Sequence, residues 1–165
     1  MDQTPRFEDQ LAALLPRLRR FAHALARNTA DADDLTQMTI ERALRSRDRW
    51  QAGTKLDSWA LTIMRNLWID TVRSRSRLGK HEAGPQEAER IGTDPTAAIH
   101  ASIELDRMMA AMQRLPQEQR EVVALILIEG FGYREAAEML GLPIGTVSSR
   151  LVRGRTALLE MVGES

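Results

Sequence analysis

Residues 133–155 read YREAAEMLGLPIGTVSSRLVRGR, and this stretch decides the fold of the C-terminal part of the chain. An amphipathic segment ends at Gly141, and a second segment opens at Ile144 after the break Leu142-Pro143. Glycine adopts the left-handed conformation of such a turn without a steric penalty. Two short helices joined in this way form a helix-turn-helix, whose second helix enters the major groove of DNA. A plain helical hairpin with a solvated basic face is the alternative.

The side chains around this turn fit the helix-turn-helix interpretation. Ala137 allows the two helices to approach closely, and a shared core is predicted from Leu140, Leu142 and Val147. The second helix carries three basic side chains, namely Arg150, Arg153 and Arg155. The sequence therefore predicts a compact helix pair that presents a basic surface.

The composition limits the classes of protein that the chain can represent. The formal net charge of the 165 residues is zero, so nucleic acid would be bound by local basic patches and not by a general positive field. There is no cysteine, and the three histidines lie far apart, so we expect no metal and no cofactor. The longest apolar run, residues 122–128, is too short to span a bilayer. The polar N-terminus lacks a signal-peptide core, which predicts a cytoplasmic protein without membrane insertion.

Helical periodicity runs through the N-terminal half, residues 1–77, which we predict to be one domain. A first helical segment covers residues 7–27, with a kink or break at Pro16. Asp31 is predicted to cap a second helix that ends near residue 45. A third helix is expected from Leu56 to about Arg77.

The character of the sequence changes after this half. Residues 78–93 have little apolar content and several glycines, so we expect a flexible linker. A second domain is predicted over residues 94–165, opening with Asp94-Pro95 as an N-cap followed by proline. A further helix starts near Pro116, is buried on more than one side and ends at Gly130. No strand pattern is present, so the predicted fold is all-α, with two small helical domains on a flexible tether.

Two patches in the N-terminal half have a composition that suits binding. Residues 31–39, DADDLTQMT, place Asp33, Asp34 and Gln37 on the helix face opposite Leu35 and Thr39. A lone acidic cluster of this kind more often stabilises its helix by interacting favourably with the helix dipole. Residues 58–80, SWALTIMRNLWIDTVRSRSRLGK, combine five basic residues with two tryptophans. Cations beside stacking surfaces suit single-stranded nucleic acid, although both tryptophans are more readily explained as core.

Taken in order, these patches closely resemble the extracytoplasmic-function (ECF) group of bacterial RNA polymerase sigma factors. The resemblance covers residues 10–160 and rests on DADDLTQ, SWALTIMRNLWIDTVRSR and LPQEQREVVALILIEGFGYREAAEMLGLPIGTVSSRLVRGR. The segment LIEGFGYREAAEML is similar to the general stress-response subgroup. The resemblance implies a protein that binds core RNA polymerase and promoter DNA, and whose activity an anti-sigma factor controls.

The resemblance also implies roles for individual residues. The N-terminal domain would contact the polymerase clamp through Asp33, Asp34, Gln37 and Met38. It would contact the −10 promoter element through Arg65, Asn66, Arg73 and Arg75, with Asn66 holding a flipped base. The C-terminal domain would contact the −35 element through Thr146, Ser148, Ser149, Arg150, Val152 and Arg153.

Two positions depart from the pattern of the group. Met38 stands where a glutamate is usual, so one polymerase contact is expected to differ. Ser148 stands where lysine or arginine is common, which predicts weaker or altered −35 recognition.

Other functions fit the sequence less well. A stand-alone helix-turn-helix regulator is the main alternative, but it needs neither of the N-terminal patches. A sigma mimic that only sequesters another protein would lose the basic residues that this chain keeps. We expect no enzyme, because the sequence shows no catalytic set of nucleophile, base and acid and no phosphate-binding glycine loop.

Overall fold

The computed structural model describes residues 4–79 and 97–163, and within these ranges it contains helices and no strand. The N-terminal half contains α1 (Phe7–Ala13), α2 (Leu15–Leu25), α3 (Thr29–Arg45), a 3₁₀ turn (Arg47–Arg49) and α4 (Leu56–Arg77). The C-terminal half contains α5 (Ala97–Arg114), α6 (Gln117–Val123), a π-helical segment (Ala124–Ile128), α7 (Tyr133–Leu140) and α8 (Ile144–Gly163). The predicted all-α class is confirmed.

The N-terminal half is a bundle in which α2, α3 and α4 contact one another. Its centre is apolar and fully buried, with Phe21, Leu25, Leu35, Leu61 and Met64 each almost inaccessible to solvent. The first helical segment breaks at Leu14, two residues before Pro16, as expected near a residue that cannot donate a backbone hydrogen bond. Trp68 is buried and Trp59 packs against the core, so the core interpretation of both tryptophans is confirmed.

The predicted cap of α3 is wrong. The N-cap residue is Asn28, whose side-chain oxygen accepts a 2.8 Å hydrogen bond from the backbone N–H of Asp31. Asparagine in an extended conformation satisfies a free N–H at the helix start as well as aspartate does. Asp31 therefore lies inside the first turn, where its carboxylate is available to another partner.

The helix-turn-helix prediction is confirmed by α7, α8 and the turn between them. Gly141 has φ +65°, and the N–H of Leu142 donates a 3.0 Å hydrogen bond to the carbonyl of Ala137. Leu140 and Val147 are buried between the helices. Helix α8 also packs closely on α6. An added Cβ at Gly154 would lie only 2.8 Å from Cγ2 of Val123.

The apolar run after Pro116 is not one regular helix. The α-helix ends at Val123 and continues as a π-helical segment, in which the N–H of Glu129 bonds the carbonyl of Ala124 at 3.0 Å. Gly130 then ends the segment with φ +77°. The run was predicted to be buried on more than one side, and its first four residues, Val122 to Leu125, are buried, whereas Leu127 is 52% exposed. The change from α-helical to π-helical pitch comes directly before Glu129, which is buried.

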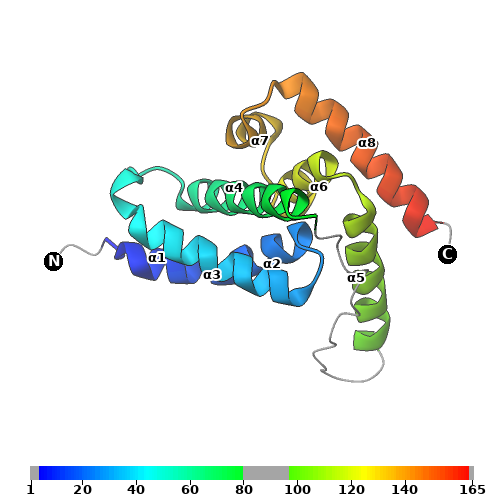
Figure 1. Cartoon of the computed structure of the whole chain (residues 1–165), viewed down its shortest axis with the longest axis horizontal. Coiled ribbons are helices and arrows are strands. Elements are labelled where there is room, and N and C mark those ends of the chain that lie inside the picture. Colours follow the sequence, from blue (N-terminus) through cyan, green and yellow to red (C-terminus); the bar gives the residue numbers. More distant parts are fainter. Residues whose placement is uncertain (1–3, 80–96, 164–165) are drawn as a thin grey trace.

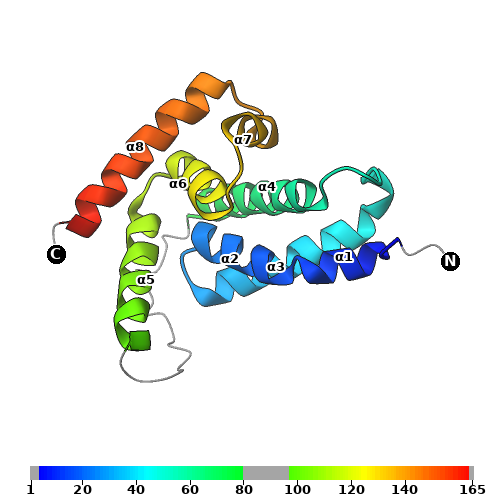
Figure 2. The same cartoon turned by 180° about the vertical axis from the view of Figure 1, so that it is seen from behind.

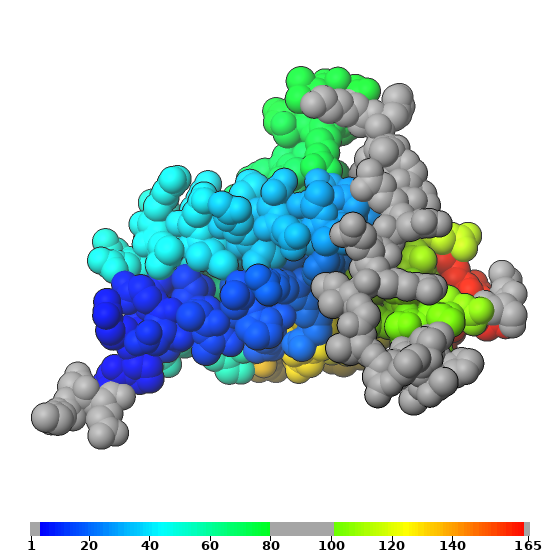
Figure 3. Space-filling model, turned by 90° about the horizontal axis from the view of Figure 1, so that it is seen from below, coloured from blue at the N-terminus to red at the C-terminus, as the bar shows by residue number. Residues whose placement is uncertain are grey.

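The two helical halves expected from the sequence are present, and they pack against each other. In Figures 1 and 2 the C-terminal helices lie along one end and one side of the N-terminal bundle. Helices α5 and α6 contact α2, and α7 contacts α4. Figure 3 shows the same side-by-side arrangement from below. Residues 80–96, which include most of the predicted linker and the predicted Asp94-Pro95 cap, lie outside the described residues.

We predict that Gly154→Ala destabilises the protein by about 1–3 kcal/mol, the usual cost of overpacking a core. The new methyl group would meet Val123, which is 1% exposed and has no room to move. Urea unfolding of the full chain measures the change. Gly145→Ala is the matched control, because a Cβ there meets nothing within 4 Å in the same helix. Equal midpoints for the two variants would contradict the close packing of α6 and α8.

Candidate functional site

The first candidate surface is the solvent-facing side of α3. Asp33, Asp34, Gln37 and Met38 are all exposed, and Met38 exposes 41% of its surface. The opposite side of the helix is core, where Leu35, Thr39 and Ala43 are buried. The structure thus brings the four predicted residues together on one face, with acidic groups beside an exposed thioether.

An ion pair joins the start of α3 to the end of α4. Both guanidinium Nη atoms of Arg75 lie 2.6 Å from the carboxylate oxygens of Asp31. The same guanidinium is 5.9 Å from the ring centroid of Trp68. The hydrogen bonds from Arg75 hold the pKa of Asp31 below its ordinary value, against the opposing effect of burial. Arg75, predicted to contact DNA, therefore has a structural contact within its own domain.

The other basic residues of α4 differ in their surroundings. Arg73 is exposed near the end of the helix, which projects beyond the other described helices at the top of Figure 3. Arg65 instead faces the C-terminal half. Its Nε and Nη2 atoms donate to the two carboxylate oxygens of Glu121 at 2.9 and 3.0 Å. The side chain of Glu121 is only 2% exposed.

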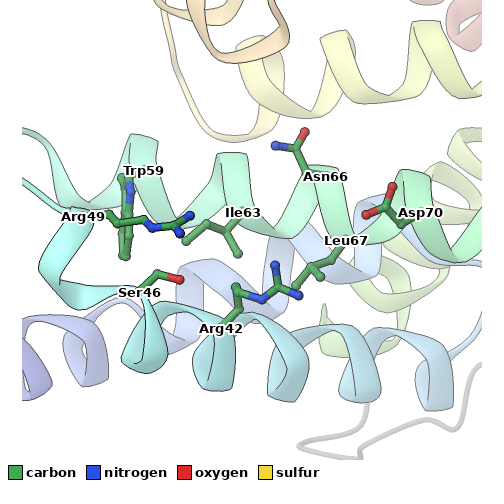
Figure 4. Close-up of a pocket in the computed structure, with 8 residues that line it drawn as sticks. All are labelled: Arg42, Ser46, Arg49, Trp59, Ile63, Asn66, Leu67 and Asp70. Carbon is green, nitrogen blue, oxygen red and sulfur yellow. The ribbon is translucent and has the colours of Figure 1, made fainter.

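Asn66 lies at the edge of an open pocket between α3 and α4. The pocket has a volume of about 200 Å³ and is lined by Arg42, Ser46, Arg49, Trp59, Ile63, Asn66, Leu67 and Asp70. This is below the about 300–1,000 Å³ that is usual for cofactor sites. Figure 4 shows the Asn66 amide pointing away from α3, whereas Arg42 extends from α3 towards Leu67. The exposed amide is therefore placed at the rim, and Trp59 and Arg49 line the other end of the pocket.

The third candidate surface is the start of α8. Ser149, Val152 and Arg153 are exposed, and Val152 shows 61% of its surface. The Arg153 guanidinium folds back along the helix and donates to the carbonyl and hydroxyl oxygens of Ser149, both at 3.3 Å. The remaining predicted residues are half-buried: Thr146, Ser148 and Arg150. The six positions form one side of the second helix of the helix-turn-helix.

Sequence reasoning missed the charged residues that join the two halves. The carboxylate of Glu129 has no exposed surface, and it accepts hydrogen bonds from Arg17 at 2.7 Å and from Arg20 at 2.9 and 3.0 Å. Arg17 also pairs with Asp57 and lies over the ring of Phe131. Burial opposes the charged form of Arg17, but its hydrogen bonds to Glu129 and Asp57 prevail and raise its pKa. One sequence feature could have indicated these contacts. An acidic residue stands at each end of the apolar run, namely Glu121 before it and Glu129 after it.

The part of the chain that the structure describes shows neither of two other kinds of site. No group of three or more histidine, cysteine, aspartate or glutamate side chains there could hold a metal ion. Across residues 4–79 and 97–163, every helix is either too short or too polar to cross a membrane.

Comparison with known proteins links these surfaces to one family. The family model described as Sigma-70 region 2 matches residues 11–78, and Sigma-70, region 4 matches residues 105–158. The chain is 38% identical over 158 residues to the ECF RNA polymerase sigma factor EcfG of Rhodopseudomonas palustris (strain TIE-1), covering 96% of this chain and 86% of that protein. It is 32% identical over 163 residues to the RNA polymerase sigma factor CarQ of Myxococcus xanthus, covering 96% and 90%.

A solved structure agrees with the sequence comparisons. The sigma factor RpoE, in complex with the anti-sigma factor NepR from Bartonella quintana, matches with a TM-score of 0.80 and 33% identity, covering 95% of this chain and 96% of that one. Regions 2 and 4 in this order define a sigma-70-type subunit, which binds RNA polymerase and directs it to promoters. Within that class, the chain belongs to the ECF RNA polymerase sigma factors.

We predict that the Asp31–Arg75 pair makes stability depend on pH in the acid range. A carboxylate whose pKa is lowered by folding stabilises the protein above its unfolded pKa of about 3.9 and loses this contribution as the pH falls through the folded value. Because the pair is partly exposed, Asp31→Asn should cost about 1 kcal/mol at pH 7. Urea unfolding should show this difference shrinking below about pH 4. Asp48→Asn, at an exposed carboxylate, is the control; a difference for Asp31→Asn that stays constant down to pH 2 would contradict the assignment.

Proposed function

We propose that the N-terminal half, residues 1–77, binds the polymerase clamp and the −10 element, and that residues 94–165 bind the −35 element. Residues 78–93 would join them. The matches to regions 2 and 4 support this division. The observation that carries the proposal is that one chain presents an exposed acidic face on α3 and a helix-turn-helix with an exposed basic second helix.

The polymerase surface is proposed to be Asp33, Asp34, Gln37 and Met38. These side chains need no rearrangement to meet a partner, because all four are exposed and their helix is anchored by its buried side. Acidic groups on a rigid helix suit a basic partner surface, since complementary charge guides association and fixes register. Met38 adds a flexible apolar contact in place of a charge.

The −10 surface is proposed to lie along α4. Arg73 and Arg75 would contact the DNA backbone, and Asn66 would contact an unstacked base. The side-chain amide of asparagine can hydrogen-bond to the polar edge of a base that has flipped out of the DNA duplex. In an intact duplex that edge is not available to the amide. Arg42 and Arg49 line the same pocket as Asn66 and supply two cations for a phosphate. Arg65 would join this surface once it leaves Glu121.

The −35 surface is proposed to comprise Thr146, Ser148, Ser149, Arg150, Val152 and Arg153. The first turns of the second helix in a helix-turn-helix face the base edges. Ser148 has a short neutral side chain at a position where the group usually has a cation, so this contact would contribute less to phosphate binding.

An anti-sigma factor is the proposed regulatory partner. The similar RpoE structure was solved in complex with the anti-sigma factor NepR. We propose that a partner of this kind covers the α3 face and part of the helix-turn-helix together, and so excludes polymerase and DNA. Recovery of a partner that binds simultaneously with core polymerase would contradict this mechanism of occlusion.

Run-off transcription with core polymerase on a library of genomic promoters tests the proposed function as a whole. Addition of the protein should produce transcripts whose upstream sequences share −10 and −35 elements. A stand-alone regulator would instead alter transcription only when another sigma factor is present.

We predict that Asp34→Arg weakens binding to core polymerase by about 2–5 kcal/mol, as is typical when a charge pair at an interface is broken. Titration of labelled protein with core polymerase measures the change. Glu104→Arg makes the same charge reversal at an exposed position on α5 and should bind normally. Asp34→Arg binding as tightly as the wild type would mean that the α3 face is not the clamp surface.

We predict that Asn66→Ala slows formation of the open complex on duplex promoters and leaves binding of core polymerase unchanged. The exposed side chain packs into no core, so the substitution should not lower stability. Permanganate footprinting on promoters that vary in the −10 element measures the loss, which should depend on the −10 sequence. An equal loss on every variant would indicate a role other than reading a base.

A further inference from the structure

We propose that the start of α1 positions the turn at residues 47–50, and so holds the guanidinium of Arg49 at the −10 pocket. The positioning residues are Phe7 and Trp50, assisted by Glu8. This inference rests on the proposed role of the pocket in −10 binding. Phe7 and Glu8 precede residues 11–78, the part of the chain that matches region 2, so α1 adds a further element to the proposed site.

The segment that links α3 to α4 has one side chain that turns inwards. Residues 47–55 are all exposed except Trp50, which is half-buried. The backbone hydrogen bonds of the turn are local. The N–H of Arg49 donates to the carbonyl of Ser46 at 2.8 Å, and the N–H of Trp50 donates to the carbonyl of Arg47 at 3.1 Å. These bonds shape the turn but join it to no other helix, so its position depends on side-chain contacts.

The Trp50 side chain packs against α1. The ring centroid of Phe7 lies 5.5 Å from that of Trp50 and 6.1 Å from that of Trp59, with interplanar angles of 48° and 74°. Tilted and edge-to-face pairs at these distances are favoured by the charge distribution of aromatic rings. The indole Nε1 of Trp50 is buried and meets no hydrogen-bond partner among the described residues. Packing of the ring therefore holds Trp50, and Phe7 connects the turn to Trp59 in the pocket wall.

An ion pair gives the turn its orientation. Nη1 of Arg47 donates to Oε1 of Glu8 at 2.7 Å, and both side chains are well exposed. Exposed pairs of this kind add little to stability, so the contact matters mainly for direction. Residues i and i+2 of a 3₁₀ helix lie two-thirds of a turn apart. With Arg47 directed to Glu8, Arg49 points another way and lines the pocket at the end where Trp59 lies (Figure 4).

The pocket needs such a support because three parts of the chain build it. Arg42 comes from α3, Arg49 from the turn and Asn66 from α4. The two helices are fixed by the core of the bundle, whereas the turn is exposed. A guanidinium held in place before binding loses less conformational freedom when it meets a phosphate. Figures 1 and 2 show α1 and the turn at the same end of the bundle, where α1 can provide this support.

Phe7→Ala tests the proposal, because it removes the aromatic contact without changing any charge. The probe is a fluorescein-labelled single strand of about 12 nucleotides that carries the −10 element, titrated with the holoenzyme. We expect several-fold weaker binding. The dependence of log K on log salt should also become shallower by about 0.7, the value for one phosphate contact on a single strand. A changed salt dependence after an uncharged substitution distinguishes positioning of a cation from a general loss of stability.

Three further variants identify the residues involved. Arg49→Ala should reduce the salt dependence by the same amount, and its combination with Phe7→Ala should reduce it no further. Trp50→Phe keeps an aromatic ring and removes only the buried N–H, so it should bind as the wild type does. Leu14→Ala is the matched control, because it truncates a partly buried apolar side chain at the other end of α1 and should leave the salt dependence unchanged.

The outcomes separate this inference from the proposed function. A wild-type salt dependence for Phe7→Ala, beside a reduced one for Arg49→Ala, would overturn the positioning role and leave the pocket assignment intact. An unchanged salt dependence for Arg49→Ala would show that Arg49 binds no phosphate, and the assignment of the pocket would fail together with the inference. An equal reduction for Leu14→Ala would indicate general loosening of α1 and would also overturn the proposal.

Discussion

The arrangement of the whole molecule depends on the carboxylate of Glu129, which is completely buried and held by Arg17 and Arg20. A charge removed from water requires paired counter-charges and hydrogen bonds, and removal of one partner of such a pair typically costs about 3–5 kcal/mol. The π-helical segment is coupled to this requirement, because its change in pitch immediately precedes Glu129. Pairing of this carboxylate fixes where α2 meets the C-terminal half.

The contacts between the halves combine apolar burial, since buried residues of both halves form one cluster, with several charged and polar contacts. Phe21, Leu35 and Met64 make region 2 a stable unit, and Val147 and Leu151 do the same for region 4. Between the units, arginine and glutamine side chains bond to carboxylates and to the exposed carbonyls at the end of α2. The physical consequence is that the relative position of the two halves depends on charge pairing as well as on apolar burial.

The sequence predicted those features that depend on local chemistry. Pro16 marked the break between α1 and α2, Gly141 marked the turn of the helix-turn-helix, and the helical spacing of Leu35 and Thr39 marked the side of α3 opposite the exposed one. It failed where residues distant in the chain decide the outcome. Asn28 and Asp31 are equally good N-caps by composition, and only the position of Arg75, 44 residues from Asp31 in the chain, shows why Asp31 points elsewhere. Nothing in the periodicity revealed that Arg65 would face Glu121, because ion pairs between halves leave no regular spacing.

The distance between the two halves in solution tests this account most directly. Donor and acceptor dyes on Ala52→Cys and Glu138→Cys would report it, since both positions are exposed and the chain has no other cysteine. Single-molecule energy transfer should show one short-distance population for the free sigma factor and a long-distance population in the complex with polymerase and promoter. Free protein that already shows the long distance of the complex would contradict the packing of the two halves through buried ion pairs.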